Sequence, residues 1–507
     1  MIIFSKNHFN KKGVRFFSFL LCLLFLFLSS GCNRNAAREF PVFEPVHPVT
    51  EESSEEEPEI DEPEGEKERP VLTVALPVSE EVMDKLVLLY TMKMGNFSGG
   101  YQSFLDDELE AFIEPLFSVT LFSTPDMGLP ADTLLTQAHA GVSLPDIFYS
   151  ETIDSLQKEN LLLPLDSYLA GNPLFLSSQM FTPSLEACRV GKDLLGIPFR
   201  GSAKLLYLDG EILENAGLSE VPYLLDLNGF SSISEMVAYA PFAESQEEDG
   251  QTELSFAEDA VENWVIPFSD SSELLSFLPA AYTSQPGWFT HKASRFHFQD
   301  RAFLDSVSFL RTYRQSLYSA DTFSEEQMEF LFPTGAPELS GHVAMWIGNS
   351  SDLNIYTRNG TRKISLSQIP SPVSGQETPP AVRVYPLCVS EKTVYPELSA
   401  SFAAFLALDK DALLLQKDAS EKPLFPLSSS EEVWDAFFEK SPHSTVWDLL
   451  RTKMIHAYYD PITSNQNLRE KIDDLIFMYK ELLLSKETEL DLAIGELTEG
   501  EKAWISG

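Results

Sequence analysis

The chain lacks the short motifs that mark several common enzyme classes. Its 507 residues contain no H-E-x-x-H metalloprotease motif, no G-x-S-x-G elbow, no Walker A loop and no G-x-G-x-x-G fingerprint. The eight histidines are scattered, without the short spacing typical of metal sites. We therefore expect a protein that binds without reacting, with no catalytic residue, cofactor or metal. A pair of glycoside-cleaving carboxylates stays open, because it is defined by a three-dimensional separation.

Positive charge is scarce. The chain has 36 Lys and Arg against 77 Asp and Glu, which gives a formal net charge of −41 at pH 7. Such an acidic surface argues against nucleic acid, whose phosphates need a basic footprint, and against electrostatic adhesion to anionic lipid. The charge indicates solubility and self-repulsion.

Cysteine is also scarce, with four residues in the chain. Cys22 and Cys32 lie at the N-terminus, which leaves Cys188 and Cys388 for the body of the protein. An exported protein is allowed a disulfide, but two cysteines far apart in sequence do not establish one. The sequence leaves this pairing open.

The N-terminus has no apolar run long enough to span a membrane. The run from Phe16 to Leu28 has 13 residues, whereas a spanning helix needs about 20. Lysines and an arginine precede the run, and the small residues 29–31 follow it. This is the layout of a secretory signal peptide, which we place at 1–31.

The end of the leader resembles the lipobox of bacterial lipoproteins, reading Leu-Ser-Ser-Gly-Cys up to Cys32. Lipoproteins usually have Leu three residues before the cysteine, and this chain has Ser29 there. The resemblance implies cleavage before Cys32 and lipidation of that residue, and two or more acyl chains suffice for stable anchoring. An ordinary cysteine in a secreted protein is the alternative. We expect an extracytoplasmic protein held at the cell membrane by lipid.

Residues 32–70 read as a disordered tether, because their Glu, Pro and Ser cannot bury enough apolar surface to offset the entropy of ordering. Strand and helix patterns alternate from Val71 onward, which predicts an α/β domain with a mostly parallel sheet. The patterns predict strands at 71–76, 118–122, 145–149, 204–208, 342–347 and 386–390, and helices at 80–94, 101–112, 131–140, 153–159, 212–216, 397–408 and 468–484.

Several segments, in order over residues 71 to about 485, together resemble the extracellular solute-binding proteins of ABC importers, especially the sugar-binding family 1 group. They include Leu-Pro-Asp-Ile-Phe-Tyr at 144–149, Gly-Lys-Asp-Leu-Leu-Gly-Ile-Pro-Phe at 191–199 and Gly-His-Val-Ala-Met-Trp-Ile-Gly at 341–348. The segments at 160–166, 206–218, 395–406 and 444–451 extend the likeness.

The resemblance implies a two-lobe periplasmic-binding-protein-like α/β fold with a hinge and an interlobe ligand cleft. Lobe one would be 71–203 and 370–422, and lobe two 204–369 and 423–507. The chain would be the monomeric, membrane-anchored component that captures a small solute, expected to be a carbohydrate or oligosaccharide, for the permease subunits of an ABC importer. A sensing or adhesive surface lipoprotein with the same fold, or a surface hydrolase, are the alternatives.

The resemblance also implies a binding site. Aromatic rings stack on sugar faces, while carboxylates, Arg and Asn fix the hydroxyls. The alternatives are an exposed helix cap for Glu151, an ion pair for Arg200, and core packing for the aromatics. Relatives commonly carry a Trp in the loop after the strand at 342–347, and this chain lacks it. The implied ligand-binding residues are Glu151, Arg200, Ser202, Tyr282, Trp288, Asn349, Ser351, Tyr385 and Trp447.

Overall fold

The leader, almost all of the tether and the helix predicted at 101–112 lie outside the residues that the structure describes. The computed structural model describes residues 69–94, 114–124, 129–150, 153–175, 180–239, 241–246, 252–257, 264–283, 289–290, 295–316, 319–357, 361–417, 424–439, 441, 444–459 and 466–505.

The described residues form a mixed central sheet of ten strands, in which seven follow the order β2-β1-β3-β14-β6-β12-β9. The sequence predicted a mostly parallel sheet, and the pairs β1–β2 and β1–β3 are parallel. Beyond them the sheet departs from that prediction, because β14 and β6 run antiparallel to their main neighbours. The strands on this path are β1 Val71–Leu76, β2 Ser118–Ser123, β3 Ile147–Tyr149, β6 Ile197–Asp209, β9 Ile266–Phe268, β12 Val343–Asn349 and β14 Ala381–Val389.

The predicted helix at 80–94 is present with those bounds, and the other predicted helices of the described part are present with ends shifted by one or two residues. At the helix near 212–216, the Asp209 carboxylate accepts hydrogen bonds from the next turn's amides, and Gly217 closes the helix with φ +83°. Within the described part, no helix has both the length and the apolarity needed to cross a membrane. The helices are α2 Glu80–Met94, α5 Ala131–His139, α6 Asp154–Lys158, α9 Gly210–Asn215, α15 Pro396–Leu408 and α20 Gln466–Leu484.

Two strands are longer than predicted. The sequence indicated strands at 204–208 and 386–390, but β6 has 13 residues and β14 has nine. Glycine and proline disfavour strands, yet β6 has partners on both sides, and this tertiary pairing overrides local propensity. A Cβ added to Gly201 would lie 2.8 Å from Leu427 Cδ2, so glycine lets the neighbouring segment approach closely.

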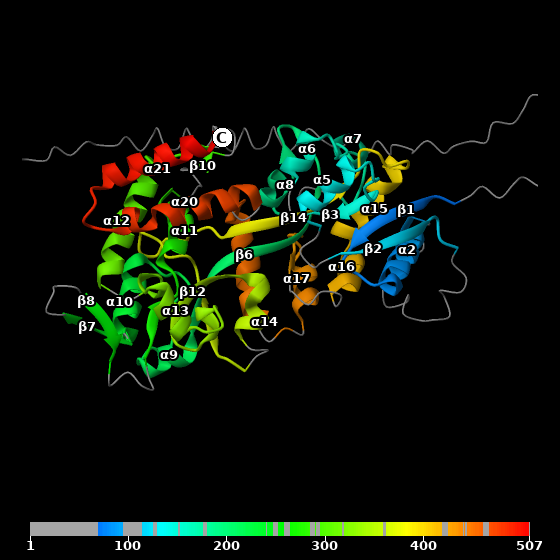
Figure 1. Cartoon of the computed structure of the whole chain (residues 1–507). Coiled ribbons are helices and arrows are strands. Elements are labelled where there is room, and N and C mark those ends of the chain that lie inside the picture. The colour runs from blue at the N-terminus through cyan, green and yellow to red at the C-terminus, as the bar shows by residue number, and fades with distance from the viewer. Residues whose placement is uncertain are drawn as a thin grey trace, which may run out of the picture. The chain divides into compact units, whose positions relative to one another are not determined.

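The buried hydrophobic residues include two large core clusters, and the helices that contribute to them lie toward opposite ends of β6 and β14 (Figure 1). The first contains side chains from β1, β3, α2, α15, α17 (Glu431–Phe438) and α18 (Ser444–Lys453). The second contains side chains from α9, α20, α10 (Leu227–Val237), α11 (Ser271–Thr283), α12 (Arg301–Ser316) and α21 (Leu490–Ile505). β6, β14 and β16 (Tyr458–Tyr459) link them, and Ala381 of β14 pairs with both Lys204 and Tyr458. This row of three strands has the connectivity expected of a hinge.

A buried ion pair fixes the far end of β6. Arg362 Nη2 lies 2.6 Å from Asp209 Oδ2, and the two side chains are 6% and 4% exposed. The Arg362 guanidinium also donates to the Glu338 carbonyl oxygen and lies 4.8 Å from the ring of Trp346, which is buried in the core. The Asp209 carboxylate therefore caps α9 and pairs with Arg362 at the same time.

The two cysteines in the body of the chain are free and fully buried. Burial is the main reason that the pKa of both thiols is raised. Cys188 packs in the first cluster and Cys388 in a smaller neighbouring one, so no disulfide joins Cys188 to Cys388 in this structure.

Candidate functional site at the strand crossing

Five of the predicted site residues lie along β6, three where it pairs with β14 and two on its other side, at the end of β12 and in the turn after it. In an antiparallel pair, directly opposed residues point to the same face of the sheet. Arg200 stands opposite Tyr385, and Ser202 stands opposite a residue that the prediction missed, Arg383. Lys204 stands opposite Asn349 on the other side. We call this group the crossing patch: Arg200, Ser202, Lys204, Asn349, Ser351, Arg383 and Tyr385.

Arg200 is the most unusual member of the patch. It is 7% exposed, and its guanidinium carbon lies 4.7 Å from the ring of Phe199 and 4.9 Å from that of Phe437 in α17. Its buried Nη1 has no hydrogen-bond partner, and no carboxylate of the described residues pairs with it. Burial lowers the pKa of the guanidinium to about 10, although nearby Tyr149 acts in the opposite direction. The ion pair weighed as an alternative is therefore not formed within the described residues.

The serine side of the patch ties the loop after β12 to β6. Ser202 Oγ lies 3.5 Å from Ser351 Oγ, and both serines are buried. Asn349 Nδ2 donates to Asp352 Oδ2 at 3.0 Å. These short polar side chains supply hydroxyl and amide groups of the kind that fix sugar hydroxyls.

The sequence-based prediction did not include two cationic residues of the patch. The Arg383 guanidinium carbon lies 4.8 Å from the ring of Tyr385, and Lys204 Nζ lies 6.0 Å from the ring of Phe277 in α11. Tyr385 itself is fully buried. The strand prediction began only at residue 386, so nothing in the sequence placed Arg383 opposite Ser202.

Trp447 packs in the first core cluster and is 2% exposed. Its ring stacks on Phe438 at a centroid distance of 4.2 Å, and its Nε1 donates to Ser441 Oγ at 3.1 Å. Phe438 in turn contacts Phe437, the ring beside Arg200. Trp447 thus supports the patch through two intervening rings, and its stacking on a ligand stays a prediction.

The remaining predicted residues do not join the patch within the described part. Tyr282 lies near the end of α11, where its hydroxyl is 3.5 Å from the Asp305 carbonyl oxygen of α12, and it packs on the second cluster. Burial is the main cause that raises the pKa of this tyrosine. Glu151 and Trp288 lie outside the described residues.

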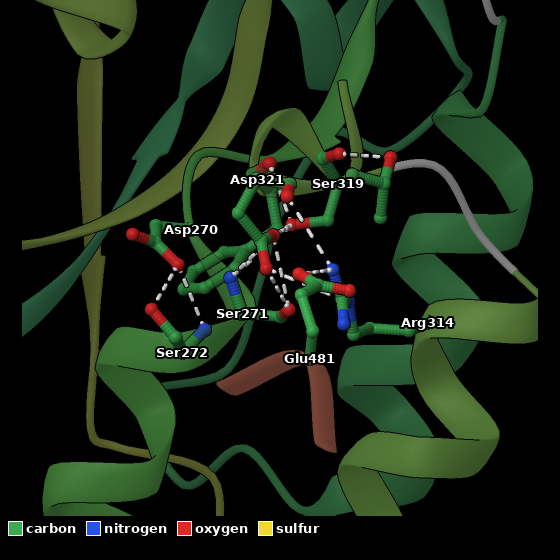
Figure 2. A network of polar contacts seen from close by, with 9 residues as sticks. Asp270, Ser271, Ser272, Arg314, Ser319, Asp321 and Glu481 are labelled. Carbon is green, nitrogen blue, oxygen red and sulfur yellow. Dashed lines mark hydrogen bonds and ion pairs between the residues drawn. The ribbon is translucent and has the colours of Figure 1, made fainter. Parts of the chain in front are cut away.

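A second polar cluster surrounds the start of α11 (Figure 2). The Asp321 carboxylate accepts from Ser271 N at 3.0 Å and from Ser271 Oγ at 2.8 Å. Asp270 Oδ1 accepts from Ser272 N at 2.8 Å. Two carboxylates thus satisfy the free amides of a helix N-terminus, which the helix dipole also favours.

The same network borders a cavity of about 550 Å³. Arg314 bridges Asp321 and Glu481, with its Nη2 3.2 Å from Glu481 Oε1 (Figure 2). No group of three or more His, Cys, Asp or Glu side chains within the described ranges is arranged to hold a metal ion. The cavity is lined by Asp270, Asp321, Glu338, Lys480 and the apolar Phe323 and Phe477, among others.

We expect Asp270→Asn to increase the free energy of unfolding at pH 7. Burial, and then the charge of Asp321, raise the pKa of Asp270 in the folded state. Between the unfolded and folded pKa values, the folded state holds a proton that the unfolded chain has lost, so stability falls as pH rises through that interval. Asparagine keeps the acceptor for Ser272 without the charge. Urea titrations should show a higher free energy of unfolding for the variant than for the parent protein at pH 7. This difference should disappear toward the pH at which a free carboxyl group is protonated.

Asp166→Asn provides the control with the opposite sign. Burial acts upward on the pKa of Asp166, but the amide of Leu194 and the guanidinium of Arg189 outweigh it, so that pKa is lowered. The contribution of the ionised Asp166 to stability is present above the pKa of the unfolded state. It is lost as pH falls through the pKa of the folded state. Asp166→Asn should therefore lose stability at pH 7, and a loss in both variants would contradict the assignment at Asp270.

Comparison with known proteins places this fold among solute-binding proteins. No family model matches the chain, and a search of curated proteins finds no match. The structure is similar to an ABC substrate-binding protein from Listeria monocytogenes in complex with cycloalternan, with TM-score 0.57 and 14% identity over 87% of this chain and 100% of that one. It is also similar to an extracellular solute-binding protein of family 1 from Alicyclobacillus acidocaldarius, with TM-score 0.56 and 16% identity over 87% and 100% of the two chains.

A third similar structure is a cyclic α-maltosyl-1,6-maltose binding protein from Arthrobacter globiformis, with TM-score 0.59 and 14% identity over 85% of this chain and 97% of that one. At these identities the likeness concerns the fold. The chain has the two-lobe, periplasmic-binding-protein-like α/β fold of these proteins, as the sequence resemblance predicted. The residue bounds assigned to the two lobes stay a prediction.

Proposed function

We propose that this chain is the solute-binding component of an ABC importer, with its ligand held at the crossing patch. The observation that carries the proposal is that Arg200, Ser202 and Tyr385 lie on β6 and β14, which link the two core clusters, with Asn349 and Ser351 beside β6. In a two-lobe protein, residues on the connecting strands contact both a bound ligand and the hinge, so binding is coupled to closure.

The proposed solute is a carbohydrate or oligosaccharide. The patch combines cations, hydroxyls and an amide with aromatic rings at its margin, which suits the alternating polar and apolar surfaces of a sugar. The similar protein from Listeria was solved in complex with cycloalternan, and the one from Arthrobacter is a cyclic α-maltosyl-1,6-maltose binding protein, which supports a carbohydrate here. The protein partner would be the importer's permease subunits, and this component would act as a monomer without enzymatic activity.

The proposed location is the outer face of the cell membrane, with lipid on Cys32 as the anchor. Residues 32–70 would then serve as the tether, reaching roughly 3 Å per residue when extended. This tether would keep the binding domain close to its permease while leaving both lobes free to dock.

Thermal unfolding in the presence of cyclic and linear oligosaccharides tests the binding function. A ligand at 100 times its Kd should stabilise the protein by about 2.7 kcal/mol, because it binds only the folded state. Asn349→Ala, which removes an amide from the patch, should lower the affinity for the saccharide that stabilises the protein. Chromatography should show that this saccharide is chemically unchanged after incubation. The importer role loses its support if no saccharide raises the unfolding temperature. It also loses support if products of saccharide cleavage accumulate.

A further inference from the structure

Arg200 carries a charge that the rest of the described protein does not balance. Its guanidinium lies beside the rings of Phe199 and Phe437, which attract a cation but accept no conventional hydrogen bond. A buried charge without a partner is strongly unfavourable. The described residues thus leave this arginine, at the site proposed for ligand binding, able to pair with an anion that a ligand supplies.

The two strands β6 and β14 contain more basic than acidic residues, whereas the whole chain contains more acidic than basic ones. Acidic residues outnumber basic ones by 77 to 36 in the whole chain. In contrast, one face of β6 and β14 carries Arg200, Lys204 and Arg383, and the single carboxylate in these two strands, Asp209, is held by Arg362. At the patch margin, Asp352 already accepts from Asn349. Basic residues therefore outnumber acidic ones by three to one in these two strands, although acidic residues dominate the whole chain.

We infer that the crossing patch binds a carbohydrate that carries an anionic group, a carboxylate or a phosphate, paired with Arg200. This inference rests on the proposed function and narrows its substrate class. A planar guanidinium matches either anion with two parallel hydrogen bonds, whereas a neutral hydroxyl satisfies a donor and leaves the charge unbalanced. Phe437, half-buried at the end of α17, is the ring that the anionic group would meet or displace.

A purely structural role for Arg200 makes a different prediction about stability. If Arg200 served to hold α17 against β6 through its ring contacts, Arg200→Met would lower the unfolding temperature of the unliganded protein. If Arg200 instead waits for an anion, methionine removes an unbalanced buried charge and keeps apolar contact with Phe199 and Phe437. Apolar replacement of buried charges is often stabilising. We therefore expect an unchanged or higher unfolding temperature.

The binding test uses matched pairs that differ in charge. Trigalacturonate is compared with its methyl ester, and glucose 1-phosphate with glucose, by calorimetric titration of the purified protein, so that carboxylate and phosphate are tested separately. At least one charged member should bind about tenfold or more tighter than its neutral counterpart. Arg200→Met should abolish this preference, and Arg200→Lys should restore part of it. Arg189→Met, which removes an arginine already paired with Asp166, should keep it.

The outcomes separate this inference from the proposed function. The inference of an anionic ligand would be overturned if neutral saccharides bound as tightly as charged ones, or if Arg200→Met kept the preference for charge. Either result would leave the importer role intact. A lower unfolding temperature in Arg200→Met, with unchanged affinity, would assign Arg200 to structure. If neither the charged nor the neutral compounds bind, the proposed function fails, and the inference fails with it.

Discussion

Arg362→Ala is expected to lower the free energy of unfolding by about 3–5 kcal/mol, because it leaves the Asp209 carboxylate buried without its counter-ion. The Asp209 and Arg362 side chains are 4% and 6% exposed, and their closest N–O distance is 2.6 Å. The substitution also removes a donor to the Glu338 carbonyl and a cation from the face of Trp346. Urea unfolding followed by circular dichroism should report the loss as an earlier midpoint.

Lys363→Ala is the matched control. Lys363 is the next residue along the chain and pairs with Glu214, but these side chains are 56% and 48% exposed. An exposed ion pair contributes about 0–1 kcal/mol, because water screens it and both side chains lose entropy when they are fixed. Equal losses in Arg362→Ala and Lys363→Ala would contradict the role assigned to the buried pair.

Cys32→Ala is expected to move nearly all of the protein from the membrane fraction to the soluble extracytoplasmic fraction. Without the thiol no lipid is attached, and the 13-residue run from Phe16 to Leu28 is too short to anchor the chain as a spanning helix. Fractionation of cells and metabolic labelling with a fatty acid should both report the change.

Cys22→Ala provides a control within the same leader, because Cys22 lies inside the apolar run, upstream of the proposed cleavage site. This variant should stay at the membrane and keep its lipid label. Membrane retention of Cys32→Ala without label would show that the leader itself is the anchor, and it would remove Cys32 from the proposal.

Local signals in the sequence were sufficient for many elements of the fold. The β-branched run at 71–76 forms β1, and the helical spacing at 80–94 forms α2 with the predicted bounds. Gly217 ends α9 in the left-handed conformation that favours glycine. In these cases each residue's preference and the tertiary fold agree, which is why short-range patterns predict them.

Register and pairing could not be predicted in the same way. Arg383 lies opposite Ser202 because two strands far apart in sequence align, and no local pattern encodes that alignment. Phe437 of α17 lies beside Arg200 of β6 although the two residues are far apart in sequence, so no local pattern predicts this contact. The resemblance to solute-binding proteins identified most residues of the patch. That Lys204 and Arg383 also belong to it follows only from the pairing of the strands.

A crystal structure of the protein with a bound saccharide from the panel tests the central claim most directly. The proposed function predicts electron density for the solute against Arg200, Ser202 and Asn349, between the two lobes. A solute bound only in the cavity at the start of α11, or on an outer surface away from β6 and β14, would contradict it.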